Sequence, residues 1–107
     1  MNKPVGSLTL DRETERLVWY ILGATRGGPM RMRIIEKLIN RPQNMNSLAR
    51  ELDVNYRTVE HHIKILIKSQ MIVEEGEGYG KIYFPSAMVE KLYEEIVEMM
   101  KRRGMNV

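Results

Sequence analysis

Residues 47–70 constrain the fold most, because they hold two helix-forming stretches separated by only three residues. We expect Asn46 to cap a short first helix over residues 47–52, since asparagine is a favoured N-cap residue. The small side chain of Ala49 lets a second helix cross this one closely. Apolar Val54, at the centre of the turn, pins the two helices together. The spacing therefore predicts a helix-turn-helix motif, whose second helix is displayed on the surface.

The second helix is expected to begin at an Asn55 cap and to run to about Gln70. Helical spacing turns one set of its side chains toward the core: Val59, His62, Ile63, Leu66 and Ile67. The opposite side is polar. In helix-turn-helix proteins the second helix enters the major groove of duplex DNA. The candidate DNA contacts on this helix are therefore Asn55, Tyr56, Arg57, Thr58, Glu60, His61 and Lys64.

These polar side chains are suited to different contacts with a duplex. Arg57 could pair bidentately with guanine, and Lys64 could neutralise a phosphate. Tyr56 and His61 could donate to phosphates or touch base edges. Glu60 could accept from cytosine, repel phosphates or tune Arg57. Each residue taken alone also fits an ordinary solvated helix surface.

The chain before the motif predicts two more helices. Asp11 is placed to cap a helix over about residues 11–25, whose apolar residues recur at helical spacing. Glycines then interrupt the chain, and Pro29 fits the first position of a helix that ends before Pro42. Residues 1–8 are interpreted as a frayed terminus.

After the motif, two β-prone stretches, residues 71–75 and 81–84, flank the glycine-rich loop GEGYG at residues 76–80. This pattern predicts a β-hairpin wing. The fold class is therefore mainly α with a small β-hairpin, a winged helix-turn-helix. Tyr79 and Lys81 are the candidate DNA contacts of the wing. Three glutamates share the hairpin with this single lysine, so we expect the wing to add little affinity.

The first and last helices point to a homodimer. Ser86 is expected to cap a last helix over about residues 86–103, which Gly104 ends. Its apolar arc is wider than one small domain needs, and aromatic and Met side chains are favoured at interface cores. The candidate interface residues are Trp19, Tyr20, Met88, Leu92, Tyr93, Ile96, Val97 and Met100. The alternative is that these side chains fill the core of a single chain.

Positive charge is concentrated in the part of the chain that contains the motif. Residues 1–70 hold 12 Lys and Arg against 7 acidic residues, whereas residues 71–107 hold 5 against 7. This asymmetry suggests a polyanionic partner, although it also fits a solvated surface.

Several classes of function are not expected. The length of 107 residues indicates one domain, and the absence of cysteine excludes disulfides and thiolate chemistry. Adjacent His61 and His62 point about 100° apart on a helix, so they do not chelate one ion readily. The glutamates of the last helix are interpreted as a solvated face. With no legible catalytic set, signal peptide or membrane-spanning run, we expect a cytoplasmic protein that is not an enzyme and has no metal or cofactor.

The stretch LARELDVNYRTVEHHIKIL, residues 48–66, followed by MIV at residues 71–73, resembles winged-helix regulators of the ArsR type. The upstream stretch TRGGPMRMRII, residues 25–35, is similar to an archaeal branch of them. The resemblance covers roughly residues 15–95 and implies a dimeric DNA-binding transcription factor, usually a repressor. Metal-sensing members carry paired cysteines on the helix before the recognition helix. Those cysteines are absent here, so metal sensing is not expected.

A different class of function stays open from the sequence. Some winged helices are protein-interaction modules, and others belong to the basal transcription or chromatin machinery without operator specificity. A pure interaction module would not need a basic recognition face, so salt-dependent binding to duplex DNA distinguishes the two.

Overall fold

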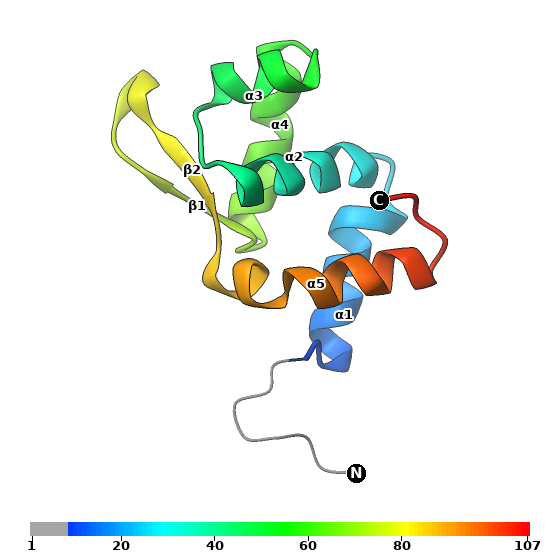
Figure 1. Cartoon of the computed structure of the whole chain (residues 1–107). Coiled ribbons are helices and arrows are strands. Elements are labelled where there is room, and N and C mark those ends of the chain that lie inside the picture. The colour runs from blue at the N-terminus through cyan, green and yellow to red at the C-terminus, as the bar shows by residue number, and fades with distance from the viewer. Residues whose placement is uncertain (1–8) are drawn as a thin grey trace.

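The computed structural model describes residues 9–107, so the predicted frayed terminus lies outside the described residues. Its elements are α1 (Arg12–Trp19), the π-helix η1 (Tyr20–Ala24), α2 (Gly28–Asn40), α3 (Met45–Leu52), α4 (Tyr56–Lys68), β1 (Ile72–Glu75), the 3-10 turn η2 (Gly78–Gly80), β2 (Ile82–Pro85) and α5 (Ala87–Arg102). In Figure 1, α2 crosses the middle, α3 and α4 lie at one end, α1 and α5 at the other, and the hairpin projects to one side. This is the predicted winged helix-turn-helix fold.

Three of the predicted helix caps are present. The side-chain oxygens of Asp11, Asn55 and Ser86 each accept a hydrogen bond from the backbone N–H three residues further on, at 2.7, 2.8 and 3.2 Å. Each bond satisfies one of the backbone donors that a helix start leaves without a partner.

The predicted cap of α3 is wrong. Asn44, and not Asn46, caps this helix, by accepting from the backbone N–H of Ser47 at 2.8 Å. The physical reason is that the apolar stripe of α3 begins at Met45 and continues at positions 48, 49 and 52. This spacing of three and four residues requires the helix to start two residues earlier than expected.

The first helix is not the single regular helix that was expected, because α1 widens into η1 at Tyr20. Its carbonyl groups find side-chain donors: the Tyr20 oxygen accepts from Thr25 Oγ1 at 2.9 Å, and the Ile21 oxygen from Arg31 Nε at 2.8 Å. A Cβ at Gly28 would lie 2.8 Å from the backbone of η1. Only glycine therefore lets the start of α2 approach η1 this closely.

The hairpin is tied to the segment that leads into α3. β1 and β2 pair antiparallel, with Val73 opposite Phe84. Gln43 forms an isolated bridge to Tyr83 of β2, with backbone N–O distances of 3.4 and 3.0 Å. The wing and the helix-turn-helix are thus joined by backbone hydrogen bonds in addition to the chain itself.

The core is one apolar cluster to which every α-helix and both strands contribute. In α4 the side chains of Val59, Ile63 and Leu66 have no exposed surface, and His62 is buried beside them as predicted. Ile67, also expected to face the core, is partly exposed. The inward face of α4 therefore matches the helical pattern of the sequence closely.

Candidate nucleic-acid interface

The turn between α3 and α4 fixes where the second helix begins. Asp53 has a left-handed backbone with φ of 54°, a conformation that aspartate tolerates better than most residues. The backbone N–H of Val54 donates to the Ala49 oxygen at 3.1 Å. The Asn55 side chain accepts from both the backbone N–H and the hydroxyl of Thr58, at 2.8 and 3.0 Å. Asn55 and Thr58 thus form the rigid start of α4.

The outward face of α4 displays the predicted polar side chains. Arg57, His61 and Lys64 are exposed, and Tyr56 and Glu60 are partly exposed. Within residues 9–107, no carboxylate lies within 4.0 Å of the charged groups of Arg57 or Lys64. Both cations are therefore free to meet an anionic partner.

A groove of about 310 Å³ separates α4 from the wing. It brings together five of the predicted DNA contacts from two elements that are distant in sequence: Tyr56, Glu60, Lys64, Tyr79 and Lys81. Arg57 and His61 do not line it and lie on the part of α4 outside the groove. The predicted contact residues therefore form one surface with two parts.

Asn46 belongs to this surface although the sequence assigned it to a helix cap. It is exposed, and with Met45 and Tyr56 it lines a small recess that Tyr79 closes from the wing. The signal that would have placed it correctly is the apolar spacing from Met45, which turns position 46 outward.

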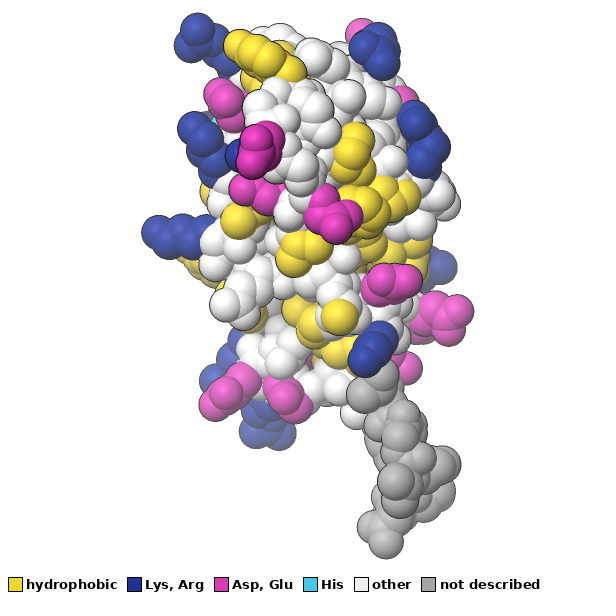
Figure 2. All heavy atoms as spheres, turned by 90° about the vertical axis from the view of Figure 1, so that its left-hand side faces the viewer, with side chains coloured by type: hydrophobic (Ala, Val, Ile, Leu, Met, Phe, Trp, Pro, Cys, Tyr) yellow, Lys and Arg dark blue, Asp and Glu magenta, His cyan; other side chains and the backbone are white. Residues whose placement is uncertain are grey.

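The wing is acidic. Its lysine, Lys81, is ion-paired with Glu74 at an N–O distance of 3.5 Å. Burial, and next the charge of Glu74, raise the pKa of Tyr83 on the groove floor. Tyr79 at the tip is 91% exposed. Figure 2, which views the molecule from the hairpin side, shows hydrophobic and acidic side chains over the middle of this face, with Lys and Arg mainly toward its edges.

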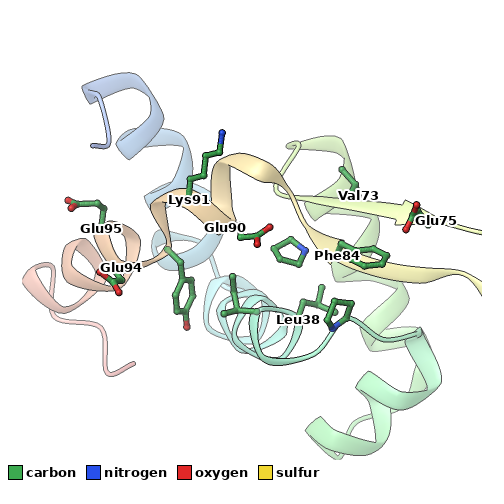
Figure 3. A pocket seen from close by; sticks show the side chains of 12 residues that line it. Leu38, Val73, Glu75, Phe84, Glu90, Lys91, Glu94 and Glu95 are labelled. Carbon is green, nitrogen blue, oxygen red and sulfur yellow. The ribbon is translucent and has the colours of Figure 1, made fainter. Parts of the chain in front are cut away.

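A larger hollow, of about 940 Å³, lies behind the wing. It is bordered by the end of α2, the outer face of the hairpin and the first half of α5 (Figure 3). None of the predicted DNA contacts lines it, and Tyr93 is the one predicted interface residue that does. This hollow is therefore separate from the groove between α4 and the wing.

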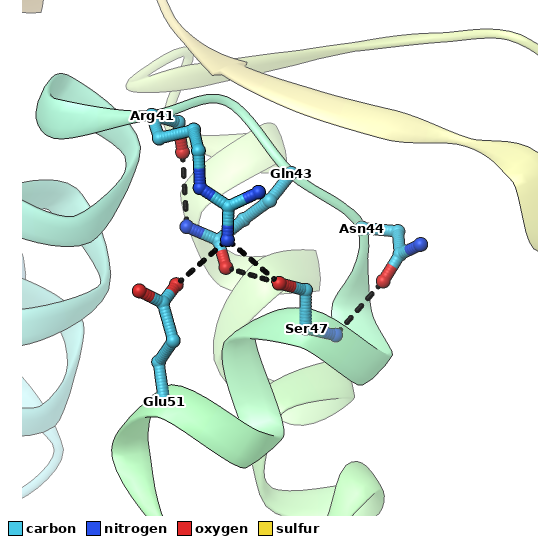
Figure 4. A network of polar contacts seen from close by, with 5 residues as sticks. All are labelled: Arg41, Gln43, Asn44, Ser47 and Glu51. Atoms are coloured by element: carbon cyan, nitrogen blue, oxygen red, sulfur yellow. Dashed lines mark hydrogen bonds and ion pairs between the residues drawn. The ribbon is translucent and has the colours of Figure 1, made fainter.

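A polar network holds the start of α3 in place (Figure 4). The buried Gln43 side chain donates to the Arg41 backbone oxygen at 2.9 Å and accepts from Ser47 Oγ at 2.7 Å. Arg41 also reaches Ser47 Oγ at 3.2 Å and forms a 3.6 Å ion pair with Glu51. The network joins the end of α2 to α3, so it orients the first helix of the helix-turn-helix.

A buried arginine connects η1 to α4. Arg31 is 5% exposed and donates to the Ile21 oxygen and to Thr25 Oγ1, and its Nη1 lies 3.2 Å from Nδ1 of His62. Because a guanidinium only donates, Nδ1 of His62 must accept, which places the ring proton on Nε2. Burial, then the charges of Arg31 and His61, lower the pKa of His62. A neutral His62 therefore links α4 to η1.

The predicted interface residues fall into three classes of burial. Leu92, Ile96 and Met100 are buried in the core of the chain itself, so part of the wide apolar arc of α5 is used internally. Tyr20 is 60% exposed. The remaining residues are partly exposed: Trp19, Met88, Tyr93 and Val97.

Two features relevant to other functions are absent from residues 9–107. This part of the chain contains no group of three or more His, Asp or Glu side chains placed to hold a metal ion. No helix within it is both long and apolar enough to cross a membrane.

The fold defines the structural class: the chain is a winged helix-turn-helix protein. Residues 24–97 match the family model for the N-terminal domain of the methanogenesis regulatory protein FilR1, and the chain belongs to this family. No curated protein matches its sequence significantly.

Solved structures share the fold at low sequence identity. The transcriptional regulator HlyU from Vibrio vulnificus aligns with a TM-score of 0.65 at 13% identity, over 84% of this chain and 88% of that one. The homodimeric winged helix-turn-helix DNA-binding domain of Mb0332 from Mycobacterium bovis, a possible ArsR-family regulator, aligns with a TM-score of 0.59 at 14% identity, over 82% and 73%. Rv0081 from M. tuberculosis aligns with a TM-score of 0.60 at 16% identity, over 95% and 87%.

Proposed function

We propose that the chain binds double-stranded DNA in a sequence-specific manner and represses transcription as a homodimer. The observation that carries this proposal is the outward face of α4, where Arg57 and Lys64 are exposed and have no carboxylate partner among the described residues. On the opposite face of α4 the side chains of Val59, Ile63 and Leu66 are buried, so the core anchors the helix from behind. Membership of a regulator family supports the same function.

The positions of the two cations along α4 imply different roles. Arg57 is the second residue of the helix, beside the Asn55 cap, and the start of a recognition helix is the part that contacts base edges. Lys64 is two turns further on and borders the groove toward the wing. We therefore assign base reading to Arg57 and a phosphate contact to Lys64.

The dimer is proposed to form through α1, η1 and α5. Tyr20 and Leu17 are large apolar side chains left exposed on this layer, and Trp19 lies beside them under the guanidinium of Arg103, 5.1 Å from the ring centroid. Aromatic side chains are favoured in interface cores. The homodimeric state of the Mb0332 domain, which has the same fold, is consistent with this arrangement.

The first test is a titration of labelled duplex DNA, selected from a random library, at several salt concentrations. The expected result is saturable binding. The logarithm of the binding constant should fall linearly with the logarithm of salt concentration, because phosphates that are neutralised by the protein release their counterions. Chelators should leave the affinity unchanged. If no duplex is selected, or if binding does not depend on salt, DNA is not the partner and a protein-interaction module is the better assignment.

The second test is light scattering at micromolar concentration, where the mass should be twice the 12.6 kDa of one chain. Tyr20→Asp should lower it toward one chain, because it places a charge in an apolar interface. Tyr79→Asp, at the exposed wing tip, is the matched control and should leave the mass unchanged. A single-chain mass for the unmodified protein, with and without DNA, contradicts the proposed dimer.

A further inference from the structure

The hollow behind the wing has an apolar floor. Leu38 and Ile39 of α2 face Val73 and Phe84, which are cross-strand partners on the outer face of the hairpin. Val73 is 49% exposed, Phe84 and Ile39 are partly exposed, and Leu38 beneath them is fully buried. Figure 3 shows the hairpin on one side of the hollow and α5 on the other, with Leu38 below. The apolar surface that remains exposed in this hollow favours binding of an apolar group from solution.

The rim of the same hollow is strongly acidic. Four glutamates line it, Glu75, Glu90, Glu94 and Glu95, against the single cation Lys91. Within residues 9–107, none of these five side chains has an ion-pair partner within 4.0 Å. In Figure 3, Lys91 extends away from Leu38 and Phe84, whereas Glu90 points toward the hairpin.

The spacing of the glutamates makes their charge unfavourable in the empty groove. Glu90 and Glu94 are one helical turn apart on α5, and like charges at this spacing destabilise a helix. A cation placed between them and the hairpin would remove this repulsion. The rim therefore complements positive charge, while the floor complements an apolar body.

We propose that this groove binds a small lipophilic organic cation, a molecule with an apolar body and one ammonium or phosphonium charge. The volume of about 940 Å³ is within the range of small-molecule sites. Burial of the apolar body against Val73 and Phe84 supplies the driving force, and the carboxylates select the sign of the charge. Such a ligand contacts the wing and α5 together without touching the DNA-facing groove.

The test uses tetraphenylphosphonium as the probe, with tetraphenylborate as a control of the same shape and opposite charge. Calorimetric titration of the full chain without DNA should show saturable binding of one phosphonium per chain and no binding of the borate. Because DNA is absent, the result does not depend on the proposed regulatory function.

Substitutions then locate the site. The double variant Glu90→Gln/Glu94→Gln should weaken phosphonium binding about tenfold. A carboxylate about 6 Å from the phosphonium charge in water changes the binding constant about threefold, and the variant removes two carboxylates. Glu98→Gln, on the same helix but outside the groove, is the matched control and should change the affinity less than about twofold. Val73→Lys, at a half-exposed position, should abolish binding, and circular dichroism checks that each variant is folded.

Three results would overturn the proposal. They are the absence of saturable phosphonium binding, equal binding of the borate, and equal affinities for the double variant and the Glu98→Gln control. Unchanged binding in a folded Val73→Lys variant would also place the cation elsewhere.

Discussion

The helix α4 and the wing border the same groove but differ in charge and in anchoring. Three side chains of α4 have no exposed surface, and its cations Arg57 and Lys64 are unpaired within residues 9–107. In β1 only Ile72 is buried, and Lys81 of the wing is neutralised by Glu74. Two elements that border the same groove therefore need not make the same contacts. We therefore expect α4 to contribute most of the affinity for DNA and the wing to form only the far wall of the groove.

The largest expected difference between the two regions is in their contribution to stability. Leu66→Ala should lower the free energy of unfolding by about 2–5 kcal/mol, because it leaves a cavity under α4. Val73→Ala on the wing should lower it by less than about 0.5 kcal/mol, since this side chain is already half exposed. Urea denaturation of both variants measures the difference. Equal losses would show that the wing is as firmly anchored as the helix.

The next effect concerns DNA reading along α4. Arg57→Ala should cost about 1–3 kcal/mol on the selected duplex and relax the preference at one base pair per half-site. Lys64→Ala should weaken all sequences alike and reduce the salt slope by about one for each phosphate that is no longer neutralised. Titration of both variants against matched and scrambled duplexes measures these changes in affinity and in salt slope. In the proposed dimer, half-site centres should lie about 34 Å apart. An equal loss on both duplexes for Arg57→Ala would make Arg57 a phosphate contact.

The buried His62 provides a pH test of how α4 is anchored to the rest of the fold. The pKa of His62 is lowered in the folded chain, so the unfolded chain takes up this proton first as the pH falls. The stabilisation is therefore complete above about pH 6.5 and decreases as the pH falls from there toward the folded pKa. Denaturation at several pH values should show this slope. His62→Gln should remove this slope because Gln does not titrate, and its side-chain oxygen can still accept from Arg31, so the contact to α2 is kept.

The smallest effect is expected at the wing tip. Tyr79→Ala should change DNA affinity by less than about 0.5 kcal/mol, because the side chain is almost fully exposed and its neighbours are acidic. Glu77→Lys, which adds a cation to the hairpin, should instead increase affinity and the salt slope. A loss from Tyr79→Ala as large as that from Arg57→Ala would remove the distinction between helix and wing.

The predictions that were confirmed depend on interactions between residues close together in the sequence. The caps at Asp11, Asn55 and Ser86 depend on one side chain and a backbone group three residues away. The prediction of Asn46 as a cap failed because two asparagines compete for the start of α3. The position of Met45 in the apolar stripe decides between them.

Local pattern was therefore enough for the order of the helices, the turn, the hairpin and the polar face of α4, because each follows from the spacing of neighbouring residues. It could not provide the Arg31–His62 contact or the bridge from Gln43 to Tyr83, which join segments far apart in the chain. Nor could it provide the π-helix, whose carbonyl groups accept from the side chains of Thr25 and Arg31. Nor could it show that Ile96 is buried in its own chain while the glutamates of α5 border an apolar hollow. The reason is that helical spacing defines the faces of an element, but only packing decides which other element covers each face.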